Sequence, residues 1–188
     1  MEREDQQLIS DYLTGDESAL HELVRRYLKA LYNFAYRLAG NTGDAEDITQ
    51  EIFIKVWKNI KRYDQNYSVK TWLFAIARNT TIDWLRKKRD LVFSDFDTDE
   101  GENSLLNTLA DPMPLSDEIM ARAEDKKFLD HALNKLPLIY REVIVLRYQD
   151  GLTFNEIGTI LGKPLDTVKS QHRRALIALR KFLIERSN

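Results

Sequence analysis

Cysteine is absent from the 188 residues, which excludes disulfides and thiolate metal sites. Glycine and proline are scarce, with seven and four residues, so long segments run without the residues that break helices. No apolar run approaches the roughly 20 residues of a membrane-spanning helix. The first residues, MEREDQQ, lack the pattern of a signal peptide. These absences favour an all-α protein of the reducing cytoplasm.

The segment over 152–180 has the pattern of two short helices joined by a tight turn. It reads LTFNEIGTILGKPLDTVKSQHRRALIALR. Thr153 and Glu156 have the spacing of a capping box, which predicts the start of the first helix. Gly162 predicts its end, because glycine enters the left-handed conformation without steric cost. A short helix, a glycine turn and a second helix are the layout of a DNA-binding helix-turn-helix.

The second helix of this motif, opened by Pro164 or Asp166, is predicted to have two faces. Apolar spacing predicts an inner face of Leu165, Val168, Ala175 and Leu179. His172 falls on the same stripe and is predicted to be a packed, neutral residue rather than a ligand. The outer face is predicted to contact DNA through Thr167, Lys169, Ser170, Gln171, Arg173 and Arg174. An ordinary helical hairpin with a solvated basic face is the alternative.

Helical periodicity over 4–14, 17–39, 44–60 and 71–89 predicts four helices in the first 89 residues. In the third, Asp44, Glu46 and Asp47 are expected in the first turn, where the helix dipole favours acids. Its apolar positions predict an inner face of Ile48, Ile52, Phe53, Val56, Trp57 and Ile60. The outer face is predicted to be polar, with Asp47, Gln50, Glu51, Lys55 and Lys58.

Residues 61–70, KRYDQNYSVK, break the helical pattern and predict a loop. The loop combines cations with Tyr63 and Tyr67, and the helix after it, TWLFAIARNTTIDWLRKKR, ends in four consecutive cations. A charged track with exposed rings binds single-stranded nucleic acid, because bases stack on aromatic side chains. The helix dipole also favours cations at a C-terminus, so composition leaves both interpretations open.

An acidic segment separates the two helical parts. Between Asp90 and Ala121 there are nine acidic residues and no lysine or arginine. The net charge of the whole chain is only −2, so the negative charge is concentrated in this segment. Prolines and glycine interrupt any helix there. Helices are predicted over 117–135 and 138–149, ahead of the helix-turn-helix. The sequence therefore predicts two small helical domains, 1–89 and 117–188, joined by a flexible acidic linker over 90–116.

Three motifs, in this order, resemble the sigma-70 family of RNA polymerase sigma factors, specifically its extracytoplasmic-function (ECF) group. DAEDITQEIFIKVW resembles the region 2 helix that binds core RNA polymerase, and TWLFAIARNTTIDWLRKKR resembles the helix that melts and holds the promoter −10 element. LPLIYREVIVLRYQDGLTFNEIGTILGKPLDTVKSQHRRAL resembles region 4, which reads the −35 element. The resemblance implies a bacterial ECF sigma factor that directs promoter-specific initiation, with an anti-sigma factor as a further partner.

The resemblance also implies which residues make each contact. Core polymerase would be bound by Asp47, Gln50, Glu51, Lys55 and Lys58. The −10 set, which would hold the melted non-template strand, is Tyr63, Asn66, Tyr67, Ser68, Lys70, Thr71, Trp72, Asn79, Arg86 and Lys87. The −35 set, which would contact duplex DNA, is Thr167, Lys169, Ser170, Gln171, Arg173 and Arg174. The family usually has arginine at position 171, so Gln171 is expected to weaken phosphate contact.

Other functions fit the sequence less well. An enzyme would have to use Asp44, Asp47 and Glu51 as metal ligands, without a nearby histidine, a glycine-rich phosphate loop or a second carboxylate cluster. We therefore expect no enzymatic activity, no cofactor and no metal. A transcriptional regulator with an N-terminal sensing or dimerisation domain would leave the basic, aromatic 61–89 segment without a role. A protein–protein adaptor with solvated basic faces is a further alternative.

Overall fold

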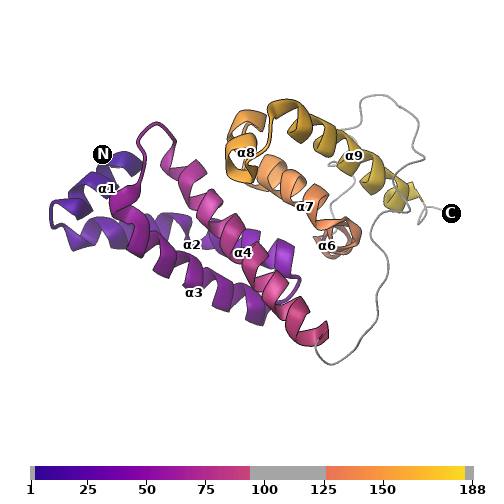
Figure 1. Cartoon of the computed structure of the whole chain (residues 1–188), viewed down its shortest axis with the longest axis horizontal. Helices are drawn as coiled ribbons and strands as arrows, with labels where there is room; N and C mark the ends of the chain where they lie inside the picture. Colours follow the sequence, from indigo (N-terminus) through magenta and orange to yellow (C-terminus); the bar gives the residue numbers. More distant parts are fainter. Residues whose placement is uncertain (1–2, 94–125, 185–188) are drawn as a thin grey trace.

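A computed structural model describes residues 3–93 and 126–184, and the regular structure in those ranges is helical (Figure 1). The first module, residues 3–93, contains α1 (Asp5–Leu13), α2 (Glu17–Ala39), α3 (Thr42–Asn59), the short η1 (Ile60–Arg62) and α4 (Val69–Phe93). The second module, residues 126–184, contains α6 (Lys126–Lys135), α7 (Leu138–Ile144), the π-helical η2 (Val145–Gln149), α8 (Phe154–Leu161) and α9 (Leu165–Ile184). The predicted all-α class is confirmed.

The predicted linker over 90–116 begins too early, because α4 continues to Phe93. The rest of that linker, with most of its acidic residues, lies outside the described residues. So does the start of the helix predicted over 117–135, of which the structure describes Lys126–Lys135.

The core of the first module forms where α2, α3 and α4 pack together. The apolar stripe of α2 follows the 3.6-residue period and is buried along its length, including Leu23, Leu31 and Phe34. The Phe34 ring meets the Phe74 ring of α4 edge-on, with 5.6 Å between centroids. The inner face of α3 adds Ile48, Ile52 and Val56, as predicted.

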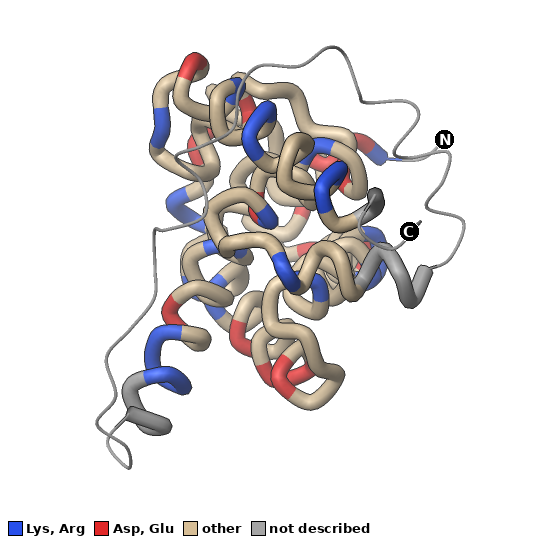
Figure 2. The backbone as a smooth tube through the Cα atoms, turned by 90° about the vertical axis from the view of Figure 1, so that its right-hand side faces the viewer, with Lys and Arg blue, Asp and Glu red and all other residues tan. Residues whose placement is uncertain are grey.

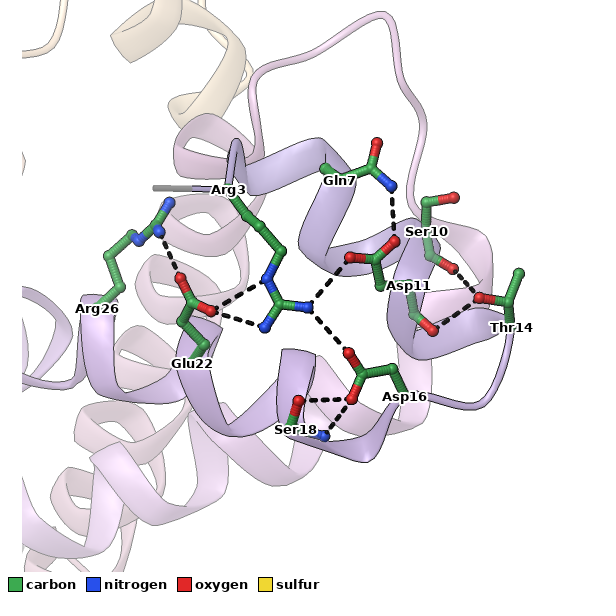
Figure 3. A network of polar contacts seen from close by, with 9 residues as sticks. All are labelled: Arg3, Gln7, Ser10, Asp11, Thr14, Asp16, Ser18, Glu22 and Arg26. Atoms are coloured by element: carbon green, nitrogen blue, oxygen red, sulfur yellow. Dashed lines mark hydrogen bonds and ion pairs between the residues drawn. The ribbon is translucent and has the colours of Figure 1, made fainter. Parts of the chain in front are cut away.

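A polar network ties α1 to the start of α2 (Figure 3). The guanidinium of Arg3 lies between three carboxylates, at 2.8 Å from Glu22, 2.9 Å from Asp16 and 3.2 Å from Asp11. Asp16 is also the N-cap of α2, where its side chain accepts a hydrogen bond from the Ser18 amide. Hydrogen bonds from Ser18 and Arg3 hold the pKa of Asp16 below its usual value. The network fixes α1 across the first turns of α2.

Two details of α3 differ from the prediction. The helix begins at Thr42 rather than Asp44, because the Asn41 side chain caps it by accepting from the Asp44 amide at 2.9 Å. Glu46 and Asp47 therefore lie beyond the first turn. Trp57 is not on the inner face: its side chain is 56% exposed and its indole N–H donates to the Tyr12 hydroxyl at 2.9 Å.

The helix-turn-helix has the predicted local chemistry. Thr153 and Glu156 form the capping box at the start of α8, and Gly162 ends that helix with φ +62. Val168, Ala175 and Leu179 are buried in α9, as predicted. Leu165 was predicted to face inward but is exposed, because it is the first residue of α9 and lies ahead of the helix's packed turns.

The two modules share one continuous apolar core. Leu73, Phe74 and Ala77 of α4 belong to the same buried cluster as Val143, Leu146 and Ile157 of the second module. A second buried cluster, within the second module, joins α6, α7 and α9. Figure 1 shows α4 running between α3 on one side and the second module on the other. Where the sequence predicted two tethered domains, the structure has two domains in close contact.

Candidate protein-binding and nucleic-acid-binding surfaces

The outer face of α3 combines charged and apolar side chains. Of the residues predicted for it, Asp47, Gln50 and Lys58 are exposed. Glu51 and Lys55 are half-buried and form an ion pair at 2.9 Å. Asp47, the exposed acid of this set, lies in the second turn of the helix.

Ile54 and Trp57 complete this face and were missing from the predicted set. Ile54 is 49% exposed, and together with the half-exposed Trp57 it forms an apolar patch with a polar border. Apolar and aromatic centres with a polar rim are typical of protein–protein interfaces. Helical spacing could have identified Ile54, since it is four residues from Gln50 and from Lys58.

The loop between η1 and α4 has a defined shape. The Tyr63 hydroxyl donates to the Tyr67 carbonyl at 2.5 Å, and the Tyr63 ring packs against Trp72 with 5.3 Å between centroids. The Asn66 amide donates to the Asp64 carboxylate at 3.0 Å, an Asx turn. Asn66, Tyr67 and Ser68 are exposed. Tyr63 therefore holds the loop through its contacts with Tyr67 and Trp72, while the side chains at the loop tip are exposed to solvent.

We expect Tyr63→Phe to loosen this loop without unfolding the module. The phenyl ring keeps the packing on Trp72, but the hydrogen bond to the Tyr67 carbonyl is lost, at a cost of about 1 kcal/mol. Hydrogen exchange at the amides of Asn66 and Tyr67 should accelerate about fivefold or more. Tyr36→Phe is the matched control, and equal exchange rates in wild type and Tyr63→Phe would show that the hydroxyl does not hold the loop.

The N-terminal part of α4 has less exposed polar surface than predicted. The Ser68 hydroxyl accepts from the Thr71 amide at 3.1 Å and so caps the helix, and Thr71 is buried. Lys70 is half-buried, and its ammonium donates to the backbone carbonyl of Asp150. Ser68 thus has a structural role, while Lys70 and Thr71 face the second module.

The C-terminal part of α4 is a cationic projection (Figure 2). Asn79, Arg86 and Lys87 are exposed, as the −10 set requires. Lys88 binds the Asp44 carboxylate of α3 at 2.6 Å, and this bond is the first cause that lowers the pKa of Asp44. Asp44 therefore fixes the base of the cationic helix end.

The outer face of α9 carries the residues predicted for duplex DNA. Thr167, Lys169, Ser170, Arg173 and Arg174 are exposed. Gln171 departs from the prediction, because it is half-buried and its amide oxygen accepts from the Lys163 ammonium at 3.3 Å. Cations and hydroxyls along one helix face suit the phosphates and base edges of a major groove.

His172 lies under this face, between two aromatic rings. It stacks on Tyr148, meets Phe154 edge-on, and its Nε2 lies 3.0 Å from the Tyr148 hydroxyl. Burial, and then the nearby Arg147, lower the pKa of His172. The prediction of a packed histidine is confirmed, and the lowered pKa favours its neutral form.

Two kinds of site are missing from the described part of the chain. Within residues 3–93 and 126–184, no three His, Asp or Glu side chains are grouped so as to hold a metal ion. In those same ranges, none of the helices is both long and apolar enough to cross a membrane.

Two family models match the chain, in the order of its modules. Sigma-70 region 2 matches residues 23–90 and Sigma-70 region 4 matches residues 132–181. The chain belongs to the sigma-70 family. Region 2 covers α2 to α4 and region 4 covers the second module with its helix-turn-helix. The sigma factor is therefore an initiation factor of transcription and not an enzyme, and the predicted resemblance is confirmed.

Relatives of the sigma factor identify its group. It is 40% identical to the ECF RNA polymerase sigma factor SigW of Bacillus subtilis, over 90% of this chain and 91% of the relative. It is 32% identical to the ECF RNA polymerase sigma-E factor of Escherichia coli K12, over 93% and 92%. The sigma factor is a member of the ECF group.

Solved structures have the same fold. The sigma factor RpoE of Bartonella quintana, in complex with the anti-sigma factor NepR, matches with a TM-score of 0.67 and 27% identity, over 87% of this chain and 95% of that one. CnrH, in complex with the cytosolic domain of CnrY, matches with a TM-score of 0.69 and 24% identity, over 96% and 97%.

Proposed function

We propose that this ECF sigma factor binds core RNA polymerase and directs initiation, in the cytoplasm, from promoters with −10 and −35 elements. The proposal is supported above all by the match of region 2 and region 4 to two helical modules that each present exposed functional side chains. A regulator with an N-terminal sensing domain would not account for region 2 over residues 23–90. The division into a first domain that extends to Phe93, a linker up to residue 116, and a second domain over 117–188 is part of the proposal.

The outer face of α3 is the proposed polymerase contact. Asp47, Gln50, Glu51, Lys55 and Lys58 border the apolar patch of Ile54 and Trp57. A desolvated aromatic centre supplies most of the binding free energy in such interfaces, while the charged rim selects the partner. We assign Ile54 and Trp57 to the centre and the five polar residues to the rim.

The loop and α4 are the proposed contact with the melted −10 strand. Tyr67 is 46% exposed at the loop tip and offers a ring for stacking, while Arg86 and Lys87 offer charge for phosphates. Trp72 and Tyr63 support the loop from below, and Asn79 is exposed along the same helix. On α9, Lys169, Arg173 and Arg174 are the proposed contacts with the −35 duplex.

An anti-sigma factor is a proposed further partner. The Bartonella quintana RpoE structure named above is a complex of a sigma factor with such a protein. We propose that a partner of this class binds the present sigma factor as well, at surfaces that polymerase or DNA would otherwise use.

Charge reversal on α3 tests the function directly. We expect the double variant Gln50→Lys, Glu51→Lys to lose co-elution with bacterial core RNA polymerase and to reduce run-off transcription at least about tenfold. The reason is that two new cations on the rim repel the partner surface that the acidic side chains match. Unchanged helical content by circular dichroism shows that α3 still folds.

The matched control is Gln7→Lys, Glu17→Lys, which makes the same two changes at exposed positions of α1 and α2, outside the proposed face. It should co-elute like wild type. If wild type itself neither co-elutes nor supports promoter-dependent transcription, the proposed function is wrong. If the double variant performs like the control, the polymerase contact lies elsewhere.

A further inference from the structure

Trp57 of α3 has a single hydrogen-bonding group, the indole N–H, and this group already has a partner within the chain. It donates to the Tyr12 hydroxyl of α1 at 2.9 Å, although 56% of the Trp57 side chain is exposed. Water would also satisfy this donor in the free protein, so the net stabilisation from the bond is small. The bond does, however, fix the direction in which the ring points.

Tyr12 is held in place by the packing of α1. It lies four residues after Leu8 and three after Ile9, and therefore on the same side of the helix. Leu8 and Ile9 are buried, and Tyr12 is half-buried against the same core. Figure 1 shows α1 beside the end of α3 that leads into η1. The Tyr12 ring thus leaves α1 on its packed side, and its hydroxyl reaches α3.

Polar contacts fix α1 on α2 (Figure 3). Arg3, ahead of α1, binds Glu22 of α2 at 2.8 Å. Asp5, in the first turn of α1, binds Arg26 and accepts a hydrogen bond from the Tyr27 hydroxyl, both on α2. Together with the buried face of α1, these contacts keep the helix from turning on α2. The Tyr12 hydroxyl is therefore an acceptor in a fixed position before any partner binds.

The hydrogen bond gains importance when a partner covers Trp57. The indole then loses its access to water, and a buried N–H without an acceptor costs far more than the bond contributes in solvent. Tyr12 supplies that acceptor from within the sigma factor. A partner that binds the ring therefore needs to offer only an apolar surface.

A ring held in advance also binds at a lower entropic cost. A side chain that is free in solution has to be ordered when an interface forms, and this ordering reduces the affinity. Ile54, three residues before Trp57 on the same face, is 49% exposed and extends the apolar surface beside the ring. The pair is thus presented as one preformed patch.

We propose that Tyr12 is a positioning residue for the polymerase contact: its hydroxyl orients the Trp57 ring and satisfies the indole N–H, and the surface of core polymerase that receives the ring is apolar. This inference rests on the proposed function. It gives a role to α1, which lies ahead of residues 23–90, the part of the chain that region 2 matches. The polymerase contact therefore depends on a helix outside that region.

Tyr12→Phe tests the positioning, because it removes the acceptor and keeps the ring that packs on the core. We expect the affinity of the full chain for purified core RNA polymerase to fall at least about fivefold in equilibrium titrations. Stability in urea should change little, since water replaces the hydroxyl in the free variant. Tyr32→Phe is the matched control, because Tyr32 is also half-buried and its hydroxyl makes no hydrogen bond within residues 3–93 and 126–184.

The indole N–H of Trp57 reports the hydrogen bond directly. In a proton–nitrogen correlation spectrum of the free protein, its resonance can be assigned by its loss in Trp57→Phe. This resonance should shift in Tyr12→Phe, while those of the other two tryptophans, Trp72 and Trp84, stay in place. A general loosening of the module would move all three.

A double-mutant cycle shows whether Tyr12 acts through Trp57. Phenylalanine at position 57 keeps an apolar ring, so binding stays measurable, but it has no N–H for Tyr12 to satisfy. Adding Tyr12→Phe to Trp57→Phe should therefore change the affinity for polymerase less than twofold. Additive losses would overturn the proposal.

An unchanged indole resonance in Tyr12→Phe would also overturn it. Equal affinities of Tyr12→Phe and wild type would do the same, since polymerase would then supply its own acceptor. Each of these outcomes leaves the proposed function standing, because wild type still binds polymerase. Failure of wild type to bind core polymerase would instead reject the proposed function, whatever the resonance shows.

Discussion

Replacing Gly158 with valine is expected to destabilise the second module by about 3 kcal/mol and to abolish binding to a −35 duplex. Gly158 lies on the buried side of α8, and a Cβ atom there would meet the Lys163 backbone oxygen at 2.9 Å. The Lys163 amide also donates to the Gly158 carbonyl at 2.9 Å, so the turn cannot move away without losing this bond. Any relief of the clash changes the angle between α8 and α9.

A second helical glycine, Gly43, provides a comparison for Gly158. Gly43 is also helical, at the start of α3, but a Cβ there would meet only the Asn41 side chain at 3.7 Å, an ordinary contact. Gly43→Ala should therefore be neutral or stabilising by up to about 1 kcal/mol, while Gly158→Ala destabilises. Urea unfolding and fluorescence anisotropy with a −35 duplex measure both effects. Equal stabilities for the two alanine variants would show that a Cβ atom at position 158 fits between α8 and the turn without a steric clash.

Asp150 should reduce the stability of the folded protein as the pH rises from about 4 to about 7, whereas the lowered pKa of His172 acts in the opposite direction. Burial raises the pKa of Asp150 to about 7, although Lys70 opposes the shift. One of its carboxylate oxygens is buried without a hydrogen-bond partner among the described residues. In that pH range the folded protein holds a proton that the unfolded chain releases, so the free energy of unfolding decreases with pH. The full effect is about 4 kcal/mol.

Asp150→Asn removes this titration. We expect the variant to be more stable than wild type at pH 8, by up to about 4 kcal/mol, and to show a flatter profile of unfolding free energy between pH 5 and 8. Urea unfolding at a series of pH values measures the difference. Glu46→Gln, at an exposed position of α3, should follow the wild-type profile. A wild-type profile for Asp150→Asn would mean that Asp150 is ionised in the folded protein at neutral pH.

Sequence alone predicts the features that arise from neighbouring residues. Both ends of α8 are determined locally. The capping box of Thr153 and Glu156 and the backbone of Gly162 form hydrogen bonds with the unpaired backbone groups of the helix ends, within one helical turn. The stripes of α2 and α3 follow from the helical period. Only Trp57 was wrong there, because its partner is Tyr12, 45 residues away, and no periodicity reports such a pair.

The contact between the modules could not be predicted in this way. Arg78 and Glu142 are 64 residues apart, and Lys70 and Asp150 are 80 apart. Lys70 and Thr71 were assigned to the −10 set by the family resemblance, which does not report contacts with the second module. The one local signal was Glu142 itself, a carboxylate within the apolar segment IYREVIVL.

The shared core of the two modules has a consequence for how partners compete. The facing surfaces of α4 and of the second module belong to one polypeptide. Each is therefore present near the other at an effective concentration on the order of millimolar, which does not depend on the amount of protein in the cell. Dilution therefore does not separate the two modules. A ligand for the covered part of α4 has to compete with the second module, which is covalently linked to it. A polymerase that contacts both modules gains from the same linkage, because binding one module raises the effective concentration of the other module at its own binding site.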